Sequence, residues 1–325
     1  MNKFKNPLPG VPHVESPFRE RLFESAPAET QRIARELGCN GYAVVDFPEP
    51  EFARISDAIK RELHGQYDWA GWRDTGRAAG KSMRIQDAWQ YNDDVKRIAL
   101  NAAIVELLSA LYGRRAWPFQ TLNFPVGTQQ HFHSDSVHFS SSPERFMCGV
   151  WVALEDVRED AGPLIYYPGS HKWPIYTNEH IGICVSRTSA PAGQALYEHL
   201  WRSRIEEAGL KPVAFLPKKG QALIWAANLL HGGAPHRSAD ATRWSQVTHY
   251  LFDDCSYYTP MHSDLMYGAV RFRHPVDIGT GRTMPNMYAG HPIPGSFMQG
   301  RPAGLRRRLR EYLRRGLRHV SHKVP

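Results

Sequence analysis

The feature that most constrains the fold is a change of sequence texture after Gly113. From there to about residue 255, short runs rich in β-branched and aromatic residues alternate with turns containing Gly and Pro. The runs cover 117–124, 129–135, 146–154, 164–167, 222–226 and 243–252. Strands at this spacing, without long helices between most of them, indicate an antiparallel sandwich or barrel. We therefore expect a mainly β fold with flanking α-helices.

Helical spacing of apolar residues precedes this region. The pattern predicts helices over 28–37, 50–64 and 93–112, with a short strand over 41–46. We expect Gly38 to end the first helix, Asp93 or Asp94 to cap the third, and Gly113 to stop it. A further helix near 194–208 is predicted inside an insertion between strands, and residues 255–300 are expected to wrap the core as ordered loop.

The charge is concentrated at one end of the chain. The 325 residues carry a formal charge of +8, and residues 301–325 hold nine cations and one acid, which is the whole excess. Apolar residues recur there every three to four positions, so we predict a basic amphipathic helix. We divide the chain into a single domain over 1–300 and this helix over 301–325. Docking on the body is its simplest role; an anionic membrane or an acidic partner protein is the alternative.

Composition excludes several classes of protein. With 42% hydrophobic and 22% charged residues the chain can bury a core, so wholesale disorder is excluded. No run of 18 apolar residues or secretory leader is visible, and the four cysteines are far apart. We expect reduced thiols and a cytoplasmic protein. Because the first 300 residues are formally neutral, no nucleic-acid partner is expected.

The candidate functional residues lie in the segment 129–135, which reads QQHFHSD. Alternate side chains of a strand share a face, so we expect His131, His133 and Asp135 to point the same way. His231 follows the predicted strand 222–226 and precedes two glycines, and Arg243 opens the next strand.

Two imidazoles and one carboxylate form the facial triad of non-haem iron(II) oxygenases. Three ligands on one face leave three positions open, of which a 2-oxo acid takes two and dioxygen the third. A separate cation must hold the far carboxylate, and the planar fork of arginine suits this task. An isolated H-x-D pattern is a weak signal, but a distant His-Gly-Gly and a following Arg strengthen it.

Longer motifs make the resemblance specific. They are QHFHSD at 130–135, GVWVALEDV at 149–157, GPL at 162–164, PGSHK at 168–172 and HGG at 231–233 with Arg243. In these stretches, which span about 115–255, the sequence resembles the phytanoyl-CoA dioxygenase family of Fe(II)/2-oxoglutarate-dependent oxygenases. The resemblance implies a double-stranded β-helix, the jelly-roll core of cupin-like proteins, with helices packed on one face.

The resemblance also implies roles for particular residues. His133, Asp135 and His231 would be the metal ligands, and Arg243 would pair with the C5 carboxylate of 2-oxoglutarate. Gln130 and Trp151 would contact the co-substrate, with Ser245 assisting. No catalytic residue beyond the metal ligands is implied.

The implied cofactors are Fe(II), with 2-oxoglutarate and O2 as co-substrates. The implied reaction decarboxylates 2-oxoglutarate to succinate and CO2 and hydroxylates an unactivated C–H bond of a small organic metabolite. Relatives that halogenate lack the carboxylate ligand, so Asp135 favours oxygenation.

Other interpretations of these residues stay open. A shift of register would exchange His131 for His133, Trp151 can be ordinary core, and Arg243 can form a structural ion pair. His138 can touch substrate but a packing role is simpler, and the turn chemistry around His171 favours a structural role. We do not expect His236 or His249 to be ligands.

Two functions from other classes compete with the oxygenase. A cupin-like protein could bind a metal or ligand without turnover, but it would need no carboxylate clamp. A scaffold recruited through the 301–325 helix is the second alternative. The sequence leaves the substrate, its attachment to CoA or a carrier, and the oligomeric state open.

Overall fold

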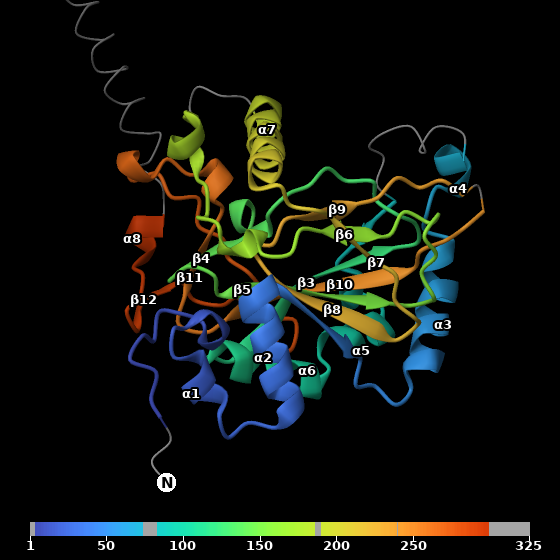
Figure 1. Cartoon of the computed structure of the whole chain (residues 1–325), viewed down its shortest axis with the longest axis horizontal. Helices are drawn as coiled ribbons and strands as arrows, with labels where there is room; N and C mark the ends of the chain where they lie inside the picture. Colours follow the sequence, from blue (N-terminus) through green and yellow to red (C-terminus); the bar gives the residue numbers. More distant parts are fainter. Residues whose placement is uncertain (1–3, 74–82, 186–189, 239, 299–325) are drawn as a thin grey trace, which may run out of the picture.

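The computed structural model describes residues 4–73, 83–185, 190–238 and 240–298 (Figure 1). The basic helix predicted at 301–325 lies outside the described residues. Among the described residues, no helix combines the length and the apolar character that crossing a bilayer requires.

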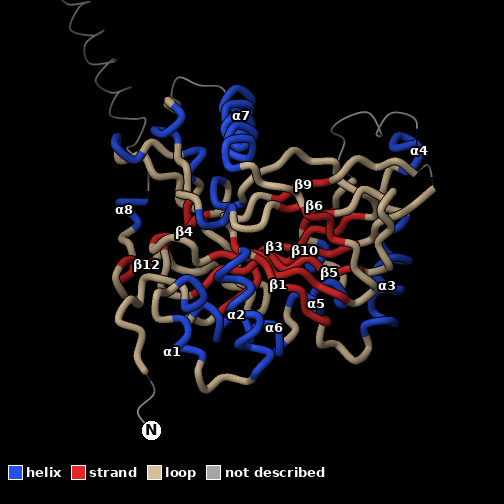
Figure 2. Tube along the Cα trace, in the orientation of Figure 1, coloured by secondary structure: helices blue, strands red, loops and turns tan. Residues whose placement is uncertain are grey.

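The main structural element is a six-stranded antiparallel sheet in the order β1-β8-β5-β10-β3-β2 (Figure 2). Its strands are β1 (Tyr42–Asp46), β2 (Ile85–Gln86), β3 (Ala116–Phe124), β5 (Met147–Ala153), β8 (Gln221–Ala226) and β10 (Ser245–Phe252). β10 pairs with β3 on one side and with β5 on the other. Four of the six predicted β runs form strands of this sheet, and a fifth, 164–167, forms a strand of the second sheet. The observed ends differ from the predicted ones by one or two residues.

A second, three-stranded antiparallel sheet has the order β7-β6-β9. Its strands are β7 (Val213–Phe215), β6 (Leu164–Tyr166) and β9 (His231–Gly233). One apolar cluster joins the two sheets, because Trp151 and Val247 of the main sheet pack with Phe215 of the second. Two facing antiparallel sheets around a shared core are consistent with the predicted jelly roll. Shorter pairs join β4 (Ser140–Ser142) to β11 (Ser256–Tyr258) and β12 (Met287–Tyr288) to β13 (His291–Pro292).

Burial on both faces of the main sheet explains its continuous apolar sequence. On β5, Cys148, Val150 and Val152 belong to a core shared with helices, whereas Trp151 and Ala153 belong to the cluster between the sheets. β8 repeats the alternation, with Ile224 in the first core and Trp225 in the second. The side chains of each strand that point toward the second sheet can therefore line a site.

The helices are α1 (Arg19–Phe23), α2 (Ala28–Asn40), α3 (Phe52–His64), α4 (Trp69–Gly71), α5 (Asp93–Ala99), α6 (Ala102–Tyr112), α7 (Ala190–Ala208) and α8 (Gly295–Met298). α2 contacts β1 and β8, while α5 and α6 contact β3 (Figure 1). α7 lies apart from them, on the side of β6 and β9 (Figure 1). There Tyr197 and Trp201 of α7 form a separate apolar cluster that includes Val137 and Leu230.

Three details of the predicted helices are wrong. The helix expected over 93–112 is two helices, because Asn101 accepts a hydrogen bond from the Ile104 amide and starts α6 anew. The cap of α5 is Asn92, not Asp93 or Asp94. α2 continues through Gly38 and ends at Gly41, whose φ of 86° is readily adopted only by glycine. Gly113 ends α6 as expected.

The predicted strand over 129–135 is also wrong. Only His133 makes a ladder-type contact there, an isolated bridge with His231, and Asp135 begins a 3-10 turn, Asp135–Val137. The segment is irregular because Gln129 has a positive φ of 52° and Gly127 meets the backbone of Ala161 and Gly162 closely. Its side chains therefore do not alternate as they would on a strand.

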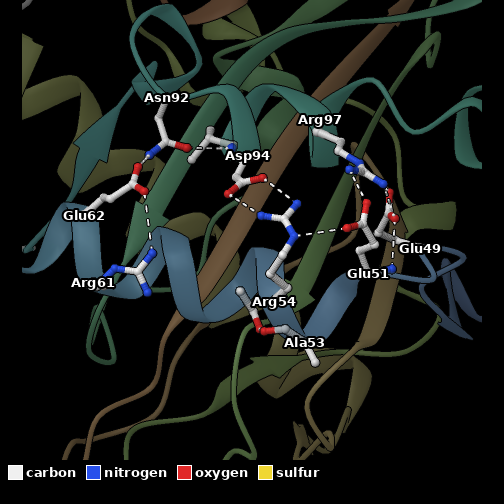
Figure 3. Close-up of polar contacts among 11 residues, drawn as sticks. Glu49, Glu51, Ala53, Arg54, Arg61, Glu62, Asn92, Asp94 and Arg97 are labelled. Carbon is white, nitrogen blue, oxygen red and sulfur yellow. Dashed lines mark hydrogen bonds and ion pairs between the residues drawn. The ribbon is translucent and has the colours of Figure 1, made fainter.

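Ion pairs hold α3 to the segment around α5 (Figure 3). Arg54 of α3 reaches Asp94 at 3.3 Å, and Arg97 of α5 reaches Glu49 at 2.8 Å. Asn92 also donates to Glu62 at 2.8 Å. The arginines are about half exposed, so these contacts set position more than they add stability.

Substitution of Gly149 tests the packing between the neighbouring strands β5 and β8. A Cβ at Gly149 would overlap the indole ring of Trp225 on the neighbouring strand. We expect Gly149→Ala to lower the free energy of unfolding by about 1–3 kcal/mol, the usual cost of overpacking a core. The measurement is chemical denaturation. Gly65→Ala is the control, because nothing lies near a Cβ at that exposed position, and equal stability of the two variants would contradict the packing described.

Candidate metal centre

A pair of backbone hydrogen bonds brings the two distant histidines together. The amide of His133 donates to the carbonyl of His231 at 3.0 Å, and the amide of His231 donates back at 3.1 Å. Asp135 follows at the start of the 3-10 turn. The three predicted ligands thus converge although one lies almost a hundred residues from the others.

The donor atoms of these three side chains are close enough to share one ion. One ligand atom of each lies within 4.8 Å of the others. Asp135 Oδ1 is 3.8 Å from His133 Nε2, and Asp135 Oδ2 is 3.9 Å from His231 Nε2. The arrangement is the two-nitrogen, one-carboxylate set that suits Fe(II) and leaves room for further ligands.

Each imidazole is oriented by its own backbone. His133 Nδ1 lies 3.0 Å from the His131 carbonyl, and His231 Nδ1 lies 3.0 Å from the Leu229 carbonyl. A carbonyl can only accept, so each Nδ1 carries the proton and each Nε2 keeps its lone pair facing Asp135. This tautomer is the one a metal requires, so the residues fit the implied ion.

Electrostatics keeps the set ready for a cation. Burial lowers the pKa of His133 to about 3, so its ring is neutral near pH 7. Burial alone would raise the pKa of Asp135, but His231, His249 and His133 outweigh it, and the Asp135 pKa falls to about 2. The site therefore presents a neutral imidazole and a charged carboxylate at neutral pH.

Two residues around Asp135 were missed by the sequence analysis. Trp225 Nε1 donates to Asp135 Oδ2 at 2.9 Å, and His249 Nε2 lies 3.7 Å from the same oxygen. His249 Nδ1 is 2.9 Å from Gln120 Oε1, which fixes the ring. The signal was the inward alternation of β8 and β10, because His249 lies four residues beyond Ser245 on the same face.

The ligands open into a cavity of 570 Å³. Gln130, Trp151 and Arg243 line it as the sequence analysis expected. Ser245 does not line it; its hydroxyl is buried without a hydrogen-bond partner among the described residues. The structure thus places Gln130, Trp151 and Arg243 in the wall of the cavity that the three predicted ligands also line, and leaves Ser245 outside that wall.

Arg243 is a buried cation without a buried anion. It is 2% exposed, and it forms no ion pair among the described residues. Its Nη2 donates to the Val126 carbonyl at 3.3 Å, its Cζ lies 5.4 Å from the Trp151 ring, and its Nε has no partner in the described part. Burial lowers its pKa to about 10, which Glu155 partly opposes. Such a group is ready to receive an anion.

The remaining histidines take other roles. His131 does not join the ligand set; its Nε2 lies 3.0 Å from Arg202 Nη2 on α7. His138 lines the cavity. His171 lies against Gly38 and Gly41 beside α2, and His236 Nδ1 lies 2.9 Å from the Ala161 carbonyl.

Comparison with known proteins places these observations in a family. The family model described as phytanoyl-CoA dioxygenase (PhyH) matches residues 13–244. A zebrafish (Danio rerio) phytanoyl-CoA dioxygenase domain-containing protein 1 is 30% identical over 42% of this chain. The peroxisomal phytanoyl-CoA dioxygenase of Rattus norvegicus is 24% identical over 54%. The matches span 43% and 50% of these relatives, so the chain covers about half of their length.

Solved structures share the fold at low identity. The α-ketoglutarate-dependent epimerase SnoN of nogalamycin biosynthesis matches with a TM-score of 0.56 and 19% identity, over 83% of this chain and 98% of its own. The carbocyclase SnoK of the same biosynthesis gives 0.54 and 17%, over 84% and 96%. EctD from S. alaskensis, solved with 2-oxoglutarate and 5-hydroxyectoine, gives 0.51 and 19%, over 85% and 86%.

The Trp225 hydrogen bond gives a test of the metal centre. We expect Trp225→Phe to weaken metal binding about 10- to 100-fold, because loss of a partner to a metal-binding carboxylate typically has this effect. Titration of the metal-free protein with Co(II), followed by visible absorption, measures the affinity. Trp117→Phe is the control, because Trp117 is buried on β3, does not line the cavity, and its Nε1 makes no hydrogen bond to a described residue. Unchanged affinity in Trp225→Phe would show that Asp135 needs no such support.

Proposed function

We propose that this chain, which belongs to the phytanoyl-CoA dioxygenase (PhyH) family, is an oxygenase dependent on Fe(II) and 2-oxoglutarate. The observation that carries the proposal is the pairing of two features in one cavity. A His–Asp–His donor set lies at its metal end, and Arg243, a buried guanidinium without an acid, lines the same cavity.

In this proposal His133, Asp135 and His231 hold Fe(II), and 2-oxoglutarate and O2 are the co-substrates. The iron supplies the activation of O2 and the oxidative decarboxylation of 2-oxoglutarate to succinate and CO2. The structures of SnoN and EctD include complexes with α-ketoglutarate or 2-oxoglutarate, which supports the co-substrate but does not fix the reaction here.

The residues of this chain position the co-substrate. Arg243 binds its C5 carboxylate, which removes the energetic penalty of a buried unpaired cation. The Trp151 ring beside Arg243 forms an apolar wall for the carbon chain, and Gln130 offers an amide at the cavity edge. Ser245 begins the strand that follows Arg243 and lies outside the lining, so it has no direct contact with the co-substrate in this proposal. Apolar lining by Leu122, Phe124 and Val247 limits water around the reacting atoms.

The finer proposal is hydroxylation of an unactivated C–H bond in a small organic metabolite. Relatives that halogenate lack the carboxylate ligand that Asp135 supplies here. The presence of this carboxylate therefore favours oxygenation. The fold does not choose among the reactions of this chemistry, because similar structures include an epimerase and a carbocyclase.

Two alternatives remain distinguishable by experiment. A cupin-like binding protein would hold a metal without consuming 2-oxoglutarate. The unpaired Arg243 disfavours this alternative, because such a protein needs no carboxylate clamp. A scaffold function would depend on residues 301–325, which lie outside the described residues, and would survive loss of turnover.

The deciding experiment adds Fe(II) and 2-oxoglutarate to the metal-free protein under anaerobic conditions. We expect the weak visible charge-transfer band of a chelated 2-oxo acid, followed by succinate formation when air is admitted with candidate substrates. Absence of both the band and succinate would leave only the binding-protein and scaffold functions.

Arg243 gives a second prediction. Arg243→Gln should weaken 2-oxoglutarate binding by about 2–5 kcal/mol, or at least ~30-fold, because a buried charge pair loses one partner. Titration of the visible band against 2-oxoglutarate measures this loss. Arg158→Gln removes an exposed cation from a surface ion pair and serves as the control. Equal 2-oxoglutarate affinities in the two variants would assign Arg243 a structural role instead.

A further inference from the structure

A second arginine without an acid lines the cavity. Arg273 is half-buried, lines the same cavity as Arg243, and forms no ion pair with any described residue. Burial lowers its pKa, and no acidic neighbour opposes the shift. A guanidinium that has a buried nitrogen and no hydrogen-bond partner for it costs stability unless a ligand supplies one. Arg273 therefore calls for an explanation that the co-substrate does not provide.

Neutral contacts hold the Arg273 side chain in place. Its Nη1 lies 3.4 Å from Thr259 Oγ1, and its Cζ lies 4.5 Å from the centre of the Phe139 ring. Its backbone amide donates to the Tyr257 carbonyl at 2.8 Å. The Nε atom is buried with no partner among the described residues. These contacts orient the guanidinium and leave hydrogen-bond donors unused.

A chain of ring contacts relates Arg273 to the metal centre. The Phe139 ring below the guanidinium lies 5.4 Å from the His249 ring, and His249 Nε2 lies 3.7 Å from Asp135 Oδ2. Arg273 is thus two side chains removed from a metal ligand. Because Arg273 and the three ligands line one cavity, a small molecule seated over the metal has its far end free to contact Arg273.

The charges in the cavity are compatible with a further anion at Arg273, whereas Arg84, the third arginine of the lining, is exposed to solvent. With Fe(II), Asp135, dianionic 2-oxoglutarate and Arg243 all present, the metal end is neutral. The positive charge of Arg273 then has no negative charge to balance it in this part of the cavity. Glu198 is the other acid in the lining, and it accepts from Gln194 on its own helix rather than from an arginine.

The cavity continues past Arg273 into a second hollow of 460 Å³. The two hollows share Gln86, Gln120, Thr259, His262 and Arg273 in their walls. Arg271 and His274 add basic groups to the second hollow. An anionic substituent at the junction therefore has space as well as a counter-charge.

We propose that Arg273 is the specificity residue for the substrate, and that it binds an anionic substituent, carboxylate or phosphate, at the end of the substrate remote from the reacting carbon. This inference rests on the proposed function, because the charge balance assumes that Arg243 is occupied by 2-oxoglutarate. It predicts a polar, anionic metabolite rather than a wholly apolar one.

The test uses the protein loaded anaerobically with Fe(II) and saturating 2-oxoglutarate, so that anions cannot enter at Arg243. Isothermal titration calorimetry compares matched probes that differ in charge: benzoate with benzamide, nicotinate with nicotinamide, and phenyl phosphate with phenol. In the natural protein we expect at least one anion to bind about 10-fold or more tightly than its neutral counterpart. The carboxylate and phosphate pairs then identify the preferred anion.

The variants decide whether Arg273 causes this preference. Arg273→Gln should abolish it, Arg273→Lys should retain part of it, and 2-oxoglutarate affinity should stay within about 3-fold in both. Arg282→Gln is the matched control, since it removes an exposed cation that lines neither hollow. It should keep the preference.

Two outcomes overturn the inference. One is equal binding of charged and neutral probes to the natural protein, including no measurable binding of either. The other is an anion preference that survives in Arg273→Gln. Either result leaves the proposed function intact if the natural protein still shows the 2-oxoglutarate band, whereas absence of that band rejects the proposed function itself.

Discussion

The site depends on one backbone contact, the reciprocal pair of hydrogen bonds between His133 and His231. It fixes the distance between the two imidazoles. A regular strand does not do this here, because the segment before Asp135 is irregular. The glycines after His231 make the contact possible. A Cβ at Gly232 would press on the Gln130 carbonyl, and one at Gly233 would press on the Gln129 amide. The His-Gly-Gly motif is thus a ligand followed by the two residues that let its strand approach the other ligands.

The cavity separates three tasks along its length. Two imidazoles, of which His133 is neutral, and a charged carboxylate occupy the metal end, where Trp225 and the backbone carbonyls set their orientation. Arg243 lies behind Trp151 and suits a co-substrate that must be held at its far carboxylate. Arg273 lies beyond Phe139 and His249, in a region free for a second molecule. Arg243 and Arg273 both have buried nitrogens without partners among the described residues, and the proposed anions would offset the cost of burying these charges.

The sequence predicted the elements whose pattern is set by burial. The strands from 116 to 252 and the apolar faces of α2 and α3 follow from alternation and helical spacing, which the packed core enforces. The break at Asn101 was missed because an apolar stripe continues across it. The irregular course of 129–135 was missed because His-Phe-His alternation imitates a strand. Convergence of the ligands was nevertheless predicted, since it came from the family motif rather than from local geometry. His249 and Arg273 were missed because the role of each depends on residues that are distant in the sequence and close only in the folded chain.

The small cluster around α7 has a consequence for how such proteins diversify. Leu230 belongs to it and Phe132 packs against it, and these residues directly precede His231 and His133. The inserted helix is therefore anchored beside both histidines of the candidate metal centre, and Arg202 adds a contact to His131. An insertion of this kind cannot be exchanged as an independent module, because a graft that lacks Tyr197 and Trp201 would loosen the coordination geometry along with the entrance. Change in this region is therefore expected on the exposed face of the helix, while the face that carries Tyr197 and Trp201 stays constant.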